Sequence, residues 1–490
     1  MGTPRKIALG VLALVACGAL VLLRMASDEP GSVEATRRAL RQQGFKTDLA
    51  DFDFSATAEC CARAEALTDV PRSREPVLMV AEGSNSAAVL WKEASLPETE
   101  GQQLLPAIEE TLEESKTELD AARDAALSGP LRFPLEARQG PTMLLPHLAA
   151  LKNDAQLLGA RAIVELRNEK REAAWTDLLA VTRLVSAWNP EPAEVSHLVR
   201  FNCVGTAFDV TWQVLQAPGW SDQQLLSLRR EWEAVDFFKG LPETAAFARA
   251  GMVALCQLER RQPPGPRMAF TALRQSPRAI WSELARDWRE YGYRHYGTYR
   301  DEKALLLYYR DRELALQRAV QSPTWAEMRQ LPGVTNQGSF QSERPYSRLQ
   351  MMLNQGRLAR GWQMRGVGLL GMAAEAEARR RLILAAIALE HYHNRRGSYP
   401  ERLEELAPEY LKSPPTDFMD GKPLRYRLLA DGHFILYSVG LDTIDHGGTM
   451  PPRQSPAEIY RRSVMPGAAA EPGDLVWPRP ASASAVRSSS

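Results

Sequence analysis

The segment that decides the fold is Thr142–Trp188, which reads TMLLPHLAALKNDAQLLGARAIVELRNEKREAAWTDLLAVTRLVSAW. Its apolar residues recur mainly at intervals of three, four or seven, as they do on one face of a helix. A polar turn at 167–170 separates the two halves, and Asn189-Pro190 ends the second. The apolar positions are Leu144, Leu148, Leu151, Leu158 and Ile163, followed by Ala174, Leu178, Val181 and Val185. The pattern predicts two antiparallel helices joined as a hairpin.

Helical patterns continue on both sides of this hairpin. Further helices are predicted at 192–216, at 221–235 with a cap at Ser221-Asp222, and at 243–260. Upstream lies an acidic helix whose glutamates are expected to face solvent. Its apolar stripe consists of Leu105, Ile108, Leu112 and Leu119. The chain is therefore expected to be mainly α-helical.

Residues 261–345 are less regular, but they contain a cluster of aromatic and basic residues. The cluster comprises Tyr291, Tyr293, His295, Tyr296 and Tyr299 with Arg289, Arg294 and Arg300. One interpretation is that these rings anchor a long helix in the core, because tyrosine commonly buries its ring and leaves its hydroxyl hydrated. The other is an exposed aromatic and basic surface.

The composition is that of an ordinary globular protein. The 490 residues include 60 Lys and Arg against 60 Asp and Glu, and 44% are hydrophobic. This balance excludes a long polyelectrolyte chain, and the length predicts two or three folded units. Because nucleic-acid affinity comes mainly from Lys and Arg that neutralise phosphates, the zero net charge argues against a nucleic-acid partner.

The cysteines do not indicate a disulfide framework. Cys60 and Cys61 are adjacent, and Cys203 and Cys256 lie within helical patterns. We expect them to be small buried apolar residues, with a bridge between Cys203 and Cys256 as the alternative.

An uncharged apolar run of 17 residues, Ile7–Leu23, follows Arg5 and Lys6 near the N-terminus. As a helix it would span about 25 Å, close to the roughly 30 Å of a bilayer core. We predict an uncleaved membrane anchor with its N-terminus in the cytoplasm, since the basic residues precede the run. Leu14-Val15-Ala16-Cys17 also fits a lipobox, so a lipoprotein attached through Cys17 is the alternative, and ordinary cleavage is a third possibility.

The C-terminal part of the chain combines a helix with a β-hairpin. Leu382, Ala385, Leu389 and Tyr392 form one apolar face of a helix that ends at Gly397. Alternating residues at 424–428 and a second run at 434–439 flank the turn Asp431-Gly432, which predicts an antiparallel hairpin. This part is expected to be a small α+β module.

Residues 373–448 resemble the globular domain of the major pseudopilin of type II secretion. The motifs that carry the resemblance are Leu389–Tyr392, Gly397–Pro400, Leu403–Leu406, Pro415–Asp417, Gly421–Leu424, Tyr426, Leu436–Gly440, Asp442 and Asp445–Gly448. The resemblance implies a helix packed on a small antiparallel sheet. A pseudopilin has its apolar helix continuous with this module, whereas here the apolar run lies far upstream. The whole chain instead resembles membrane-anchored bacterial proteins that append such a module to a helical body.

The resemblance also implies a possible calcium site. In the family, the loop after the second strand binds calcium, and the matching positions here are Asp442 and Asp445, with His446 in place of a further acidic residue. Imidazole is a poor ligand for so hard an ion. The alternative is a tight loop held by bonds from side chains to the backbone. No other cofactor is predicted.

Common catalytic signatures are absent from the sequence. There is no phosphate loop, His-Glu-x-x-His pair, Cys-x-x-Cys pair or Gly-x-Ser-x-Gly elbow. The glycine pattern Gly366–Gly371 does not follow a β-branched strand, which argues against a dinucleotide site. His391 and His393 are two apart on a predicted helix and are expected at the surface. No catalytic residue is therefore predicted.

These observations predict five segments: an anchor at 1–26, a mixed region at 27–140, a helical domain at 141–372, the α+β module at 373–448 and a disordered tail at 449–490. The expected location is the bacterial inner membrane, with one span and most of the chain in the periplasm. The expected role is that of a non-catalytic scaffold or interaction module linked to secretion or surface assembly. The alternative is an enzyme whose site is assembled from scattered residues. Protein partners are not identifiable from sequence.

Overall fold

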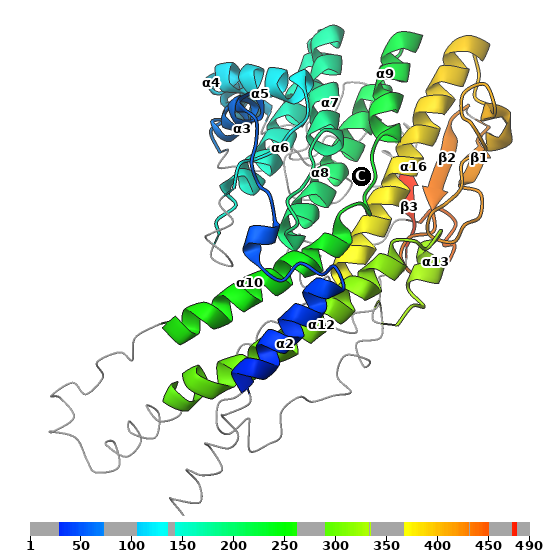
Figure 1. Cartoon of the computed structure of the whole chain (residues 1–490). Coiled ribbons are helices and arrows are strands. Elements are labelled where there is room, and N and C mark those ends of the chain that lie inside the picture. Colours follow the sequence, from blue (N-terminus) through cyan, green and yellow to red (C-terminus); the bar gives the residue numbers. More distant parts are fainter. Residues whose placement is uncertain are drawn as a thin grey trace, which may run out of the picture.

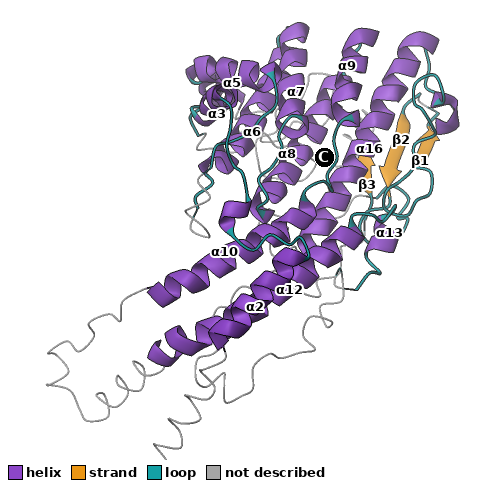
Figure 2. Cartoon of the chain, in the orientation of Figure 1, coloured by secondary structure: helices purple, strands orange, loops and turns teal. Residues whose placement is uncertain are grey.

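The computed structural model describes residues 29–72, 105–135, 143–261, 290–332, 334, 367–430, 432–449 and 473–477. Within these ranges the chain is mainly helical and contains one small antiparallel sheet (Figures 1 and 2). This confirms the predicted fold class at that level. The helices form a body from which a three-helix stalk extends, and the sheet covers one side of a long helix, α16.

The body is built on the predicted helical hairpin. Its helices are α6 (Pro146–Arg167) and α7 (Arg171–Ser186), and α8 (Glu194–Leu215) and α9 (Asp222–Glu233) follow as predicted. Of the predicted apolar positions, Leu151, Leu158 and Ile163 are fully buried. Leu144, in contrast, is 80% exposed. That prediction was wrong because Pro146 begins the helix, which leaves Leu144 in the preceding loop.

A layer of shorter helices covers one side of the hairpin. It consists of α3 (Ala58–Thr68), α4 (Leu105–Glu114) and α5 (Lys116–Ser128), so the predicted acidic helix is divided at Ser115. Arg161 joins this layer to the hairpin, since its guanidinium bonds Asp177 through Nε (2.7 Å) and Nη2 (2.8 Å) and Asp120 through Nη1 (2.9 Å). The ion network thereby connects α5, α6 and α7.

The stalk consists of α2 (Glu29–Gln42), α10 (Leu241–Arg261) and α12 (Thr298–Ala319), with the π-helical turn η5 (Tyr293–Gly297) before α12. Glu302 of α12 is completely buried and accepts hydrogen bonds from Arg37 of α2 and Arg260 of α10. Nearer the body, Arg249 bonds Glu313 at 2.7 Å. A buried carboxylate that lost these partners would be costly, so the ion pairs specify how the three helices meet.

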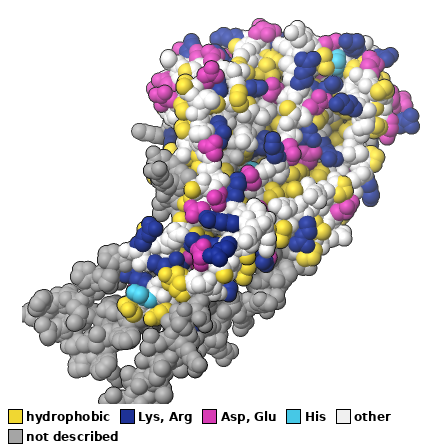
Figure 3. All heavy atoms as spheres, viewed as in Figure 1, with side chains coloured by type: hydrophobic (Ala, Val, Ile, Leu, Met, Phe, Trp, Pro, Cys, Tyr) yellow, Lys and Arg dark blue, Asp and Glu magenta, His cyan; other side chains and the backbone are white. Residues whose placement is uncertain are grey.

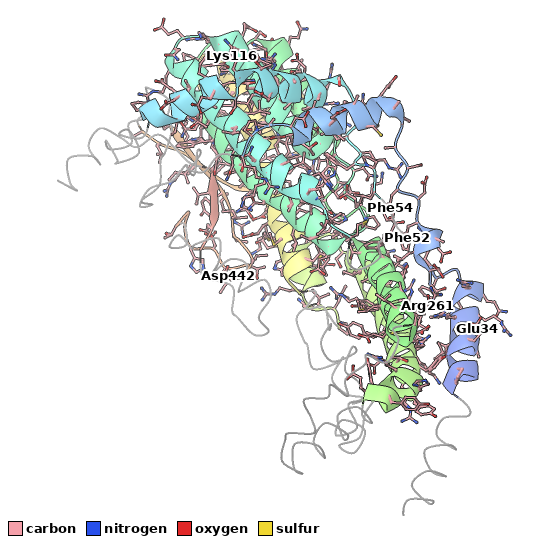
Figure 4. The ribbon with its side chains drawn as sticks, turned by 90° about the vertical axis from the view of Figure 1, so that its left-hand side faces the viewer. Glu34, Phe52, Phe54, Lys116, Arg261 and Asp442 are labelled. Carbon is pink, nitrogen blue, oxygen red and sulfur yellow. The ribbon has the colours of Figure 1, made fainter. Side chains whose placement is uncertain are left out.

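A short segment connects α2 to the body along α10. It contains the 3-10 turn η1 (Leu49–Asp51), followed by Phe52 and Phe54, whose rings pack edge-on against Phe247 at 5.4 and 5.7 Å between centroids. Both phenylalanines lie beside α10 where the stalk meets the body (Figure 4). The chain that precedes the body is therefore fixed along the stalk by apolar contacts.

The terminal module is built on α16 (Val367–Arg396), which extends across the predicted boundary between residues 372 and 373. The chain then forms η7 (Leu403–Leu406), β1 (Arg425–Leu428) and β2 (Phe434–Ser438), which pair antiparallel as predicted. The short helix α13 (Trp325–Met328) also packs here, since its Trp325 donates to the carbonyl oxygen of Leu441 at 2.9 Å. One face of α16 packs on α8 and α9, and another on the sheet.

The segment 449–490, which was predicted to be disordered, contributes a third strand. β3 (Leu475–Trp477) pairs antiparallel with β2, giving the order β1-β2-β3. Trp477 is 4% exposed and packs edge-on against Phe208 of α8 at 5.2 Å between centroids. The prediction was wrong at these residues because three apolar residues within a Pro- and Ser-rich stretch are too short a signal to indicate a strand without its partner.

Among the described residues, no helix combines the length and the apolar character needed to cross a bilayer. The predicted anchor, Ile7–Leu23 with Cys17, lies outside these residues. Cys60, Cys203 and Cys256 are buried and, like Cys61, free, so the alternative of a bridge between Cys203 and Cys256 was wrong.

The packing of the hairpin makes a prediction about stability. Replacement of the fully buried Leu158 by Ala should lower the free energy of unfolding by about 2–5 kcal/mol, since it removes buried methyl groups and leaves a cavity. The matched variant Leu144→Ala changes an exposed leucine and should have little effect. Urea unfolding followed by circular dichroism measures both. Equal losses in the two variants would contradict the observed start of α6.

Candidate functional site

The predicted calcium ligands lie in the loop that follows β2, next to α13, since Arg329 at the end of α13 donates to the carbonyl oxygens of Leu441 and Asp442. This loop begins at Gly440, whose φ is +66°. A Cβ at Gly440 would collide with the carbonyl oxygen of Gly473, because the segment entering β3 passes directly beside it. Two constraints therefore favour glycine at position 440: the left-handed backbone conformation and the close approach of the segment that enters β3.

Asp442 is bonded within the loop itself. Its Oδ2 lies 2.8 Å from Nε2 of His446, and its Oδ1 accepts a hydrogen bond from the backbone N–H of Ile444 at 3.0 Å. The second contact is a turn in which a side chain bonds the backbone two residues ahead. Figure 4 shows Asp442 beside the sheet.

Asp445 faces a different set of donors. Its Oδ1 accepts from the Tyr437 hydroxyl (3.0 Å) and the Gly447 N–H (2.9 Å), and its Oδ2 lies 3.4 Å from Nε of Arg425. The bond from the Gly447 backbone, together with Tyr437 and Arg425, lowers the pKa of Asp445. The carboxylate is thus held in its charged form by donors from the protein.

A third carboxylate, Asp474, was missed because it precedes β3 in the segment predicted to be disordered. It is 1% exposed and accepts hydrogen bonds from the backbone N–H groups of His446 (3.1 Å) and Gly448 (2.7 Å). Burial raises its pKa. The signal that could have indicated it is the short apolar run Leu475–Trp477 directly after an acidic residue.

Arg425 of β1 connects the loop to the turn before the sheet. Its Nη1 bonds Asp417 at 3.1 Å, and its Nη2 bonds Asp420 at 2.6 Å. Asp417 is fully buried and also accepts from the Ser438 hydroxyl (2.7 Å) and the Val439 N–H (3.0 Å). This buried carboxylate therefore joins the turn at 415–420 to the end of β2.

Asp442 and Asp445 of the loop, and Asp474 of the segment that enters β3, each accept hydrogen bonds from donors of the protein. Arg425 supplies positive charge to Asp445, and His446 lies against Asp442. In the described part of the chain, no group of three or more His, Cys, Asp or Glu side chains is placed to hold a metal ion. The sequence left two interpretations open, a calcium site and a tight loop. This geometry favours the tight loop.

His391 was predicted at the surface, and the structure corrects that prediction. His391 is 8% exposed, and its Nε2 lies 3.1 Å from Asp222 at the start of α9. Arg395, one turn further along α16, bonds the same carboxylate at 2.6 Å. Asp222, which the sequence indicated only as a cap, thus joins α9 to α16. His393 lies apart from this pair and stacks on Tyr399.

Glu390 is the most strongly shifted carboxyl group of the module. It is largely enclosed between α16 and the segment 399–400, and it accepts a hydrogen bond from the Tyr399 hydroxyl at 2.7 Å. Burial raises the pKa of Glu390 to about 7, and the bond from Tyr399 opposes this shift only in part.

Other shifted groups lie in the body, where each interacts with different charges. Burial raises the pKa of Glu165 to about 7, beside Asp177 and Arg161, and that of Glu194 to about 7, opposed by Arg312. Burial lowers the pKa of His197 to about 3, with a contribution from Arg200. Glu165 is near the end of α6, whereas Glu194 begins α8. Glu194 and His197 are three residues apart at the start of α8, so these two groups share one face of that helix.

Gly368 and Gly371 of the glycine pattern lie inside α16. A dinucleotide loop needs its glycines in the turn between a strand and a helix, so this position does not fit such a site.

Comparisons with protein families, with curated proteins and with solved structures find no match for this chain. The resemblance to a pseudopilin module rests on the motifs of the sequence.

The loop geometry makes a prediction about calcium. We expect neither a binding heat nor a shift of the melting temperature for the full chain at about 1 mM calcium, because Arg425 and His446 already lie against the two carboxylates. Isothermal titration calorimetry and thermal melting measure this. A saturable heat that disappears in the double variant Asp442→Asn/Asp445→Asn would contradict the tight-loop interpretation and establish the calcium site.

The burial of Glu390 makes a prediction about pH. Its pKa is about 7 in the folded protein and near 4.5 when unfolded, so the folded state holds the proton more tightly. Its contribution to stability is therefore present below pH 4.5 and is lost as the pH rises through 7. Glu390→Gln should remove this loss and unfold with a free energy about 1–3 kcal/mol higher at pH 8 than the unmodified protein.

The control for this experiment is Glu405→Gln, which changes an exposed glutamate that also bonds a tyrosine, Tyr392. Urea unfolding at pH 5 and pH 8 should show the change only for Glu390→Gln. If the free energy of unfolding differs between pH 5 and pH 8 by the same amount in Glu390→Gln and in the unmodified protein, the result would contradict the burial of this carboxyl.

Proposed function

We propose that this protein is a non-catalytic, membrane-anchored scaffold of the bacterial cell envelope. In this proposal Ile7–Leu23 anchors the chain in the inner membrane, and the stalk holds the body and the terminal module in the periplasm. The module offers a surface for protein partners in secretion or surface assembly.

The observation that carries the proposal is the position of α2. This helix begins at Glu29, only six residues after the apolar run ends, and it lies along the stalk. Six residues of extended chain span at most about 22 Å. An anchor at Ile7–Leu23 would therefore place the start of the stalk close to the bilayer and the body away from it (Figure 1).

The packing of the stalk and the module supports the same role. Buried ion pairs join all three stalk helices, and Asp222, Arg395 and His391 join the body to α16. A packed connection from the stalk to the terminal sheet suits a protein that presents a surface.

Membrane attachment is tested by fractionation of the native, full-length protein. Val15→Arg places a charge at the centre of the apolar run, which costs about 2.5–3.5 kcal/mol of insertion free energy, and should release the protein from membranes. Cys17→Ser should leave it bound if the run is an uncleaved anchor, and should release it if the protein is a lipoprotein.

Orientation is tested with C-terminal fusions. A C-terminal fusion to alkaline phosphatase should be active. A C-terminal fusion to a fluorescent protein that matures only in the cytoplasm should not fluoresce. The reverse pattern, or unmodified protein in the soluble fraction, would contradict the proposal.

A further inference from the structure

The end of the stalk farthest from the body exposes aromatic and apolar side chains beside basic ones. Tyr291 is 52% exposed and stacks on the exposed His295 with 4.0 Å between ring centroids. Leu258, 48% exposed, lies in the last turn of α10, and the exposed Arg261 ends that helix. We call Leu258, Arg261, Tyr291 and His295 the stalk tip. Figure 3 shows hydrophobic, histidine and basic side chains together at this end.

The rings that hold the stalk together are different ones from the exposed rings of the tip. Tyr293, two residues after Tyr291, is fully buried and donates its hydroxyl to Asp301 at 2.8 Å. Tyr299 packs under the guanidinium of Arg260 at 3.9 Å. These two rings fasten the start of α12, as one of the two interpretations of the tyrosine cluster expected. Tyr291 and His295 extend beyond them, as the other interpretation expected.

The tip and the start of α2, which follows the predicted anchor in the sequence, lie at the same end of the stalk. Ser32, in the first turn of α2, accepts a hydrogen bond from Lys303 in the second turn of α12. α2 therefore starts next to the start of α12 (Figures 1 and 4). With at most about 22 Å of chain between Leu23 and Glu29, an anchored protein holds this end within reach of the headgroups.

The chemistry of the tip suits a lipid surface. Tyrosine rings favour the boundary between hydrocarbon and water, where the apolar ring and the polar hydroxyl are both satisfied. Basic side chains are attracted to the surface of an anionic bilayer. Arg261 provides such a charge beside Leu258, and His295 lies beneath Tyr291.

We propose that the stalk tip rests in the headgroup layer of the anionic membrane that holds Ile7–Leu23, and so fixes the angle of the stalk to the bilayer. The inference rests on the proposed membrane attachment and adds a second contact with the same membrane. The anchor alone would leave the stalk free to tilt, whereas two contacts define its direction.

The test uses the full chain in proteoliposomes, with photoreactive benzoylphenylalanine in place of Tyr291 or, as the matched control, in place of Leu314. Leu314 is 38% exposed on α12 but lies toward its other end, near the body. Illumination should give lipid adducts at position 291, detected by mass spectrometry, and none at position 314. In phosphatidylglycerol vesicles Arg261→Glu should reduce the adducts, and in phosphatidylcholine vesicles it should not.

Flotation of the vesicles separates the possible failures. Protein that floats with the vesicles but gives no lipid adduct at position 291, or equal adducts at 291 and 314, overturns the tip contact and leaves the anchor intact. Protein adducts in place of lipid adducts at position 291 show a protein partner and also overturn it. Protein that does not float overturns the anchor and the tip contact together.

Discussion

Helix α16 is buried on two faces at once, and this constraint fixes how the terminal module sits on the body. Small side chains line much of its length, so that neighbouring backbones approach closely; the buried alanines are Ala373, Ala374, Ala376, Ala378, Ala385, Ala386 and Ala388. Its last turn is fixed to α9 through Asp222. β3 adds a further connection through Trp477 on Phe208. Because α16 packs against both, the body and the module share one continuous hydrophobic core and are not separate domains joined by a linker.

Buried charges recur where segments distant in sequence meet. Glu302 joins the three stalk helices, Asp177 joins α6 to α7 through Arg161, and Asp417 joins a turn to the end of β2 through Arg425. Such pairs add little net stability, since desolvation offsets much of their attraction. A misplaced segment would leave a buried charge without its partner. We interpret these pairs as features that specify one arrangement of the helices.

The residues that carry the resemblance to a pseudopilin have structural roles in this chain. Gly440 allows the approach of β3, and Asp417 bonds the end of β2. The Tyr426 hydroxyl bonds the carbonyl oxygen of Pro400 at 2.7 Å, which holds the Tyr-Pro segment against the sheet. These residues close a small sheet on a helix. Their pattern therefore indicates an architecture more directly than an activity, which is consistent with a presenting role for the module.

The sequence alone determined the features that depend on local periodicity. The hairpin of α6 and α7, the helices that follow it and the antiparallel pairing of β1 with β2 were predicted because helix and strand repeats appear within a few residues. The tertiary structure decided what depends on residues far apart in the chain. It buried His391 against Asp222, brought Asp474 into the loop of Asp442 and Asp445, and made a strand of Leu475–Trp477. A strand of three residues gains its hydrogen bonds only from its neighbour, and a buried charge is tolerated only beside its partner, so neither can be seen in a local pattern.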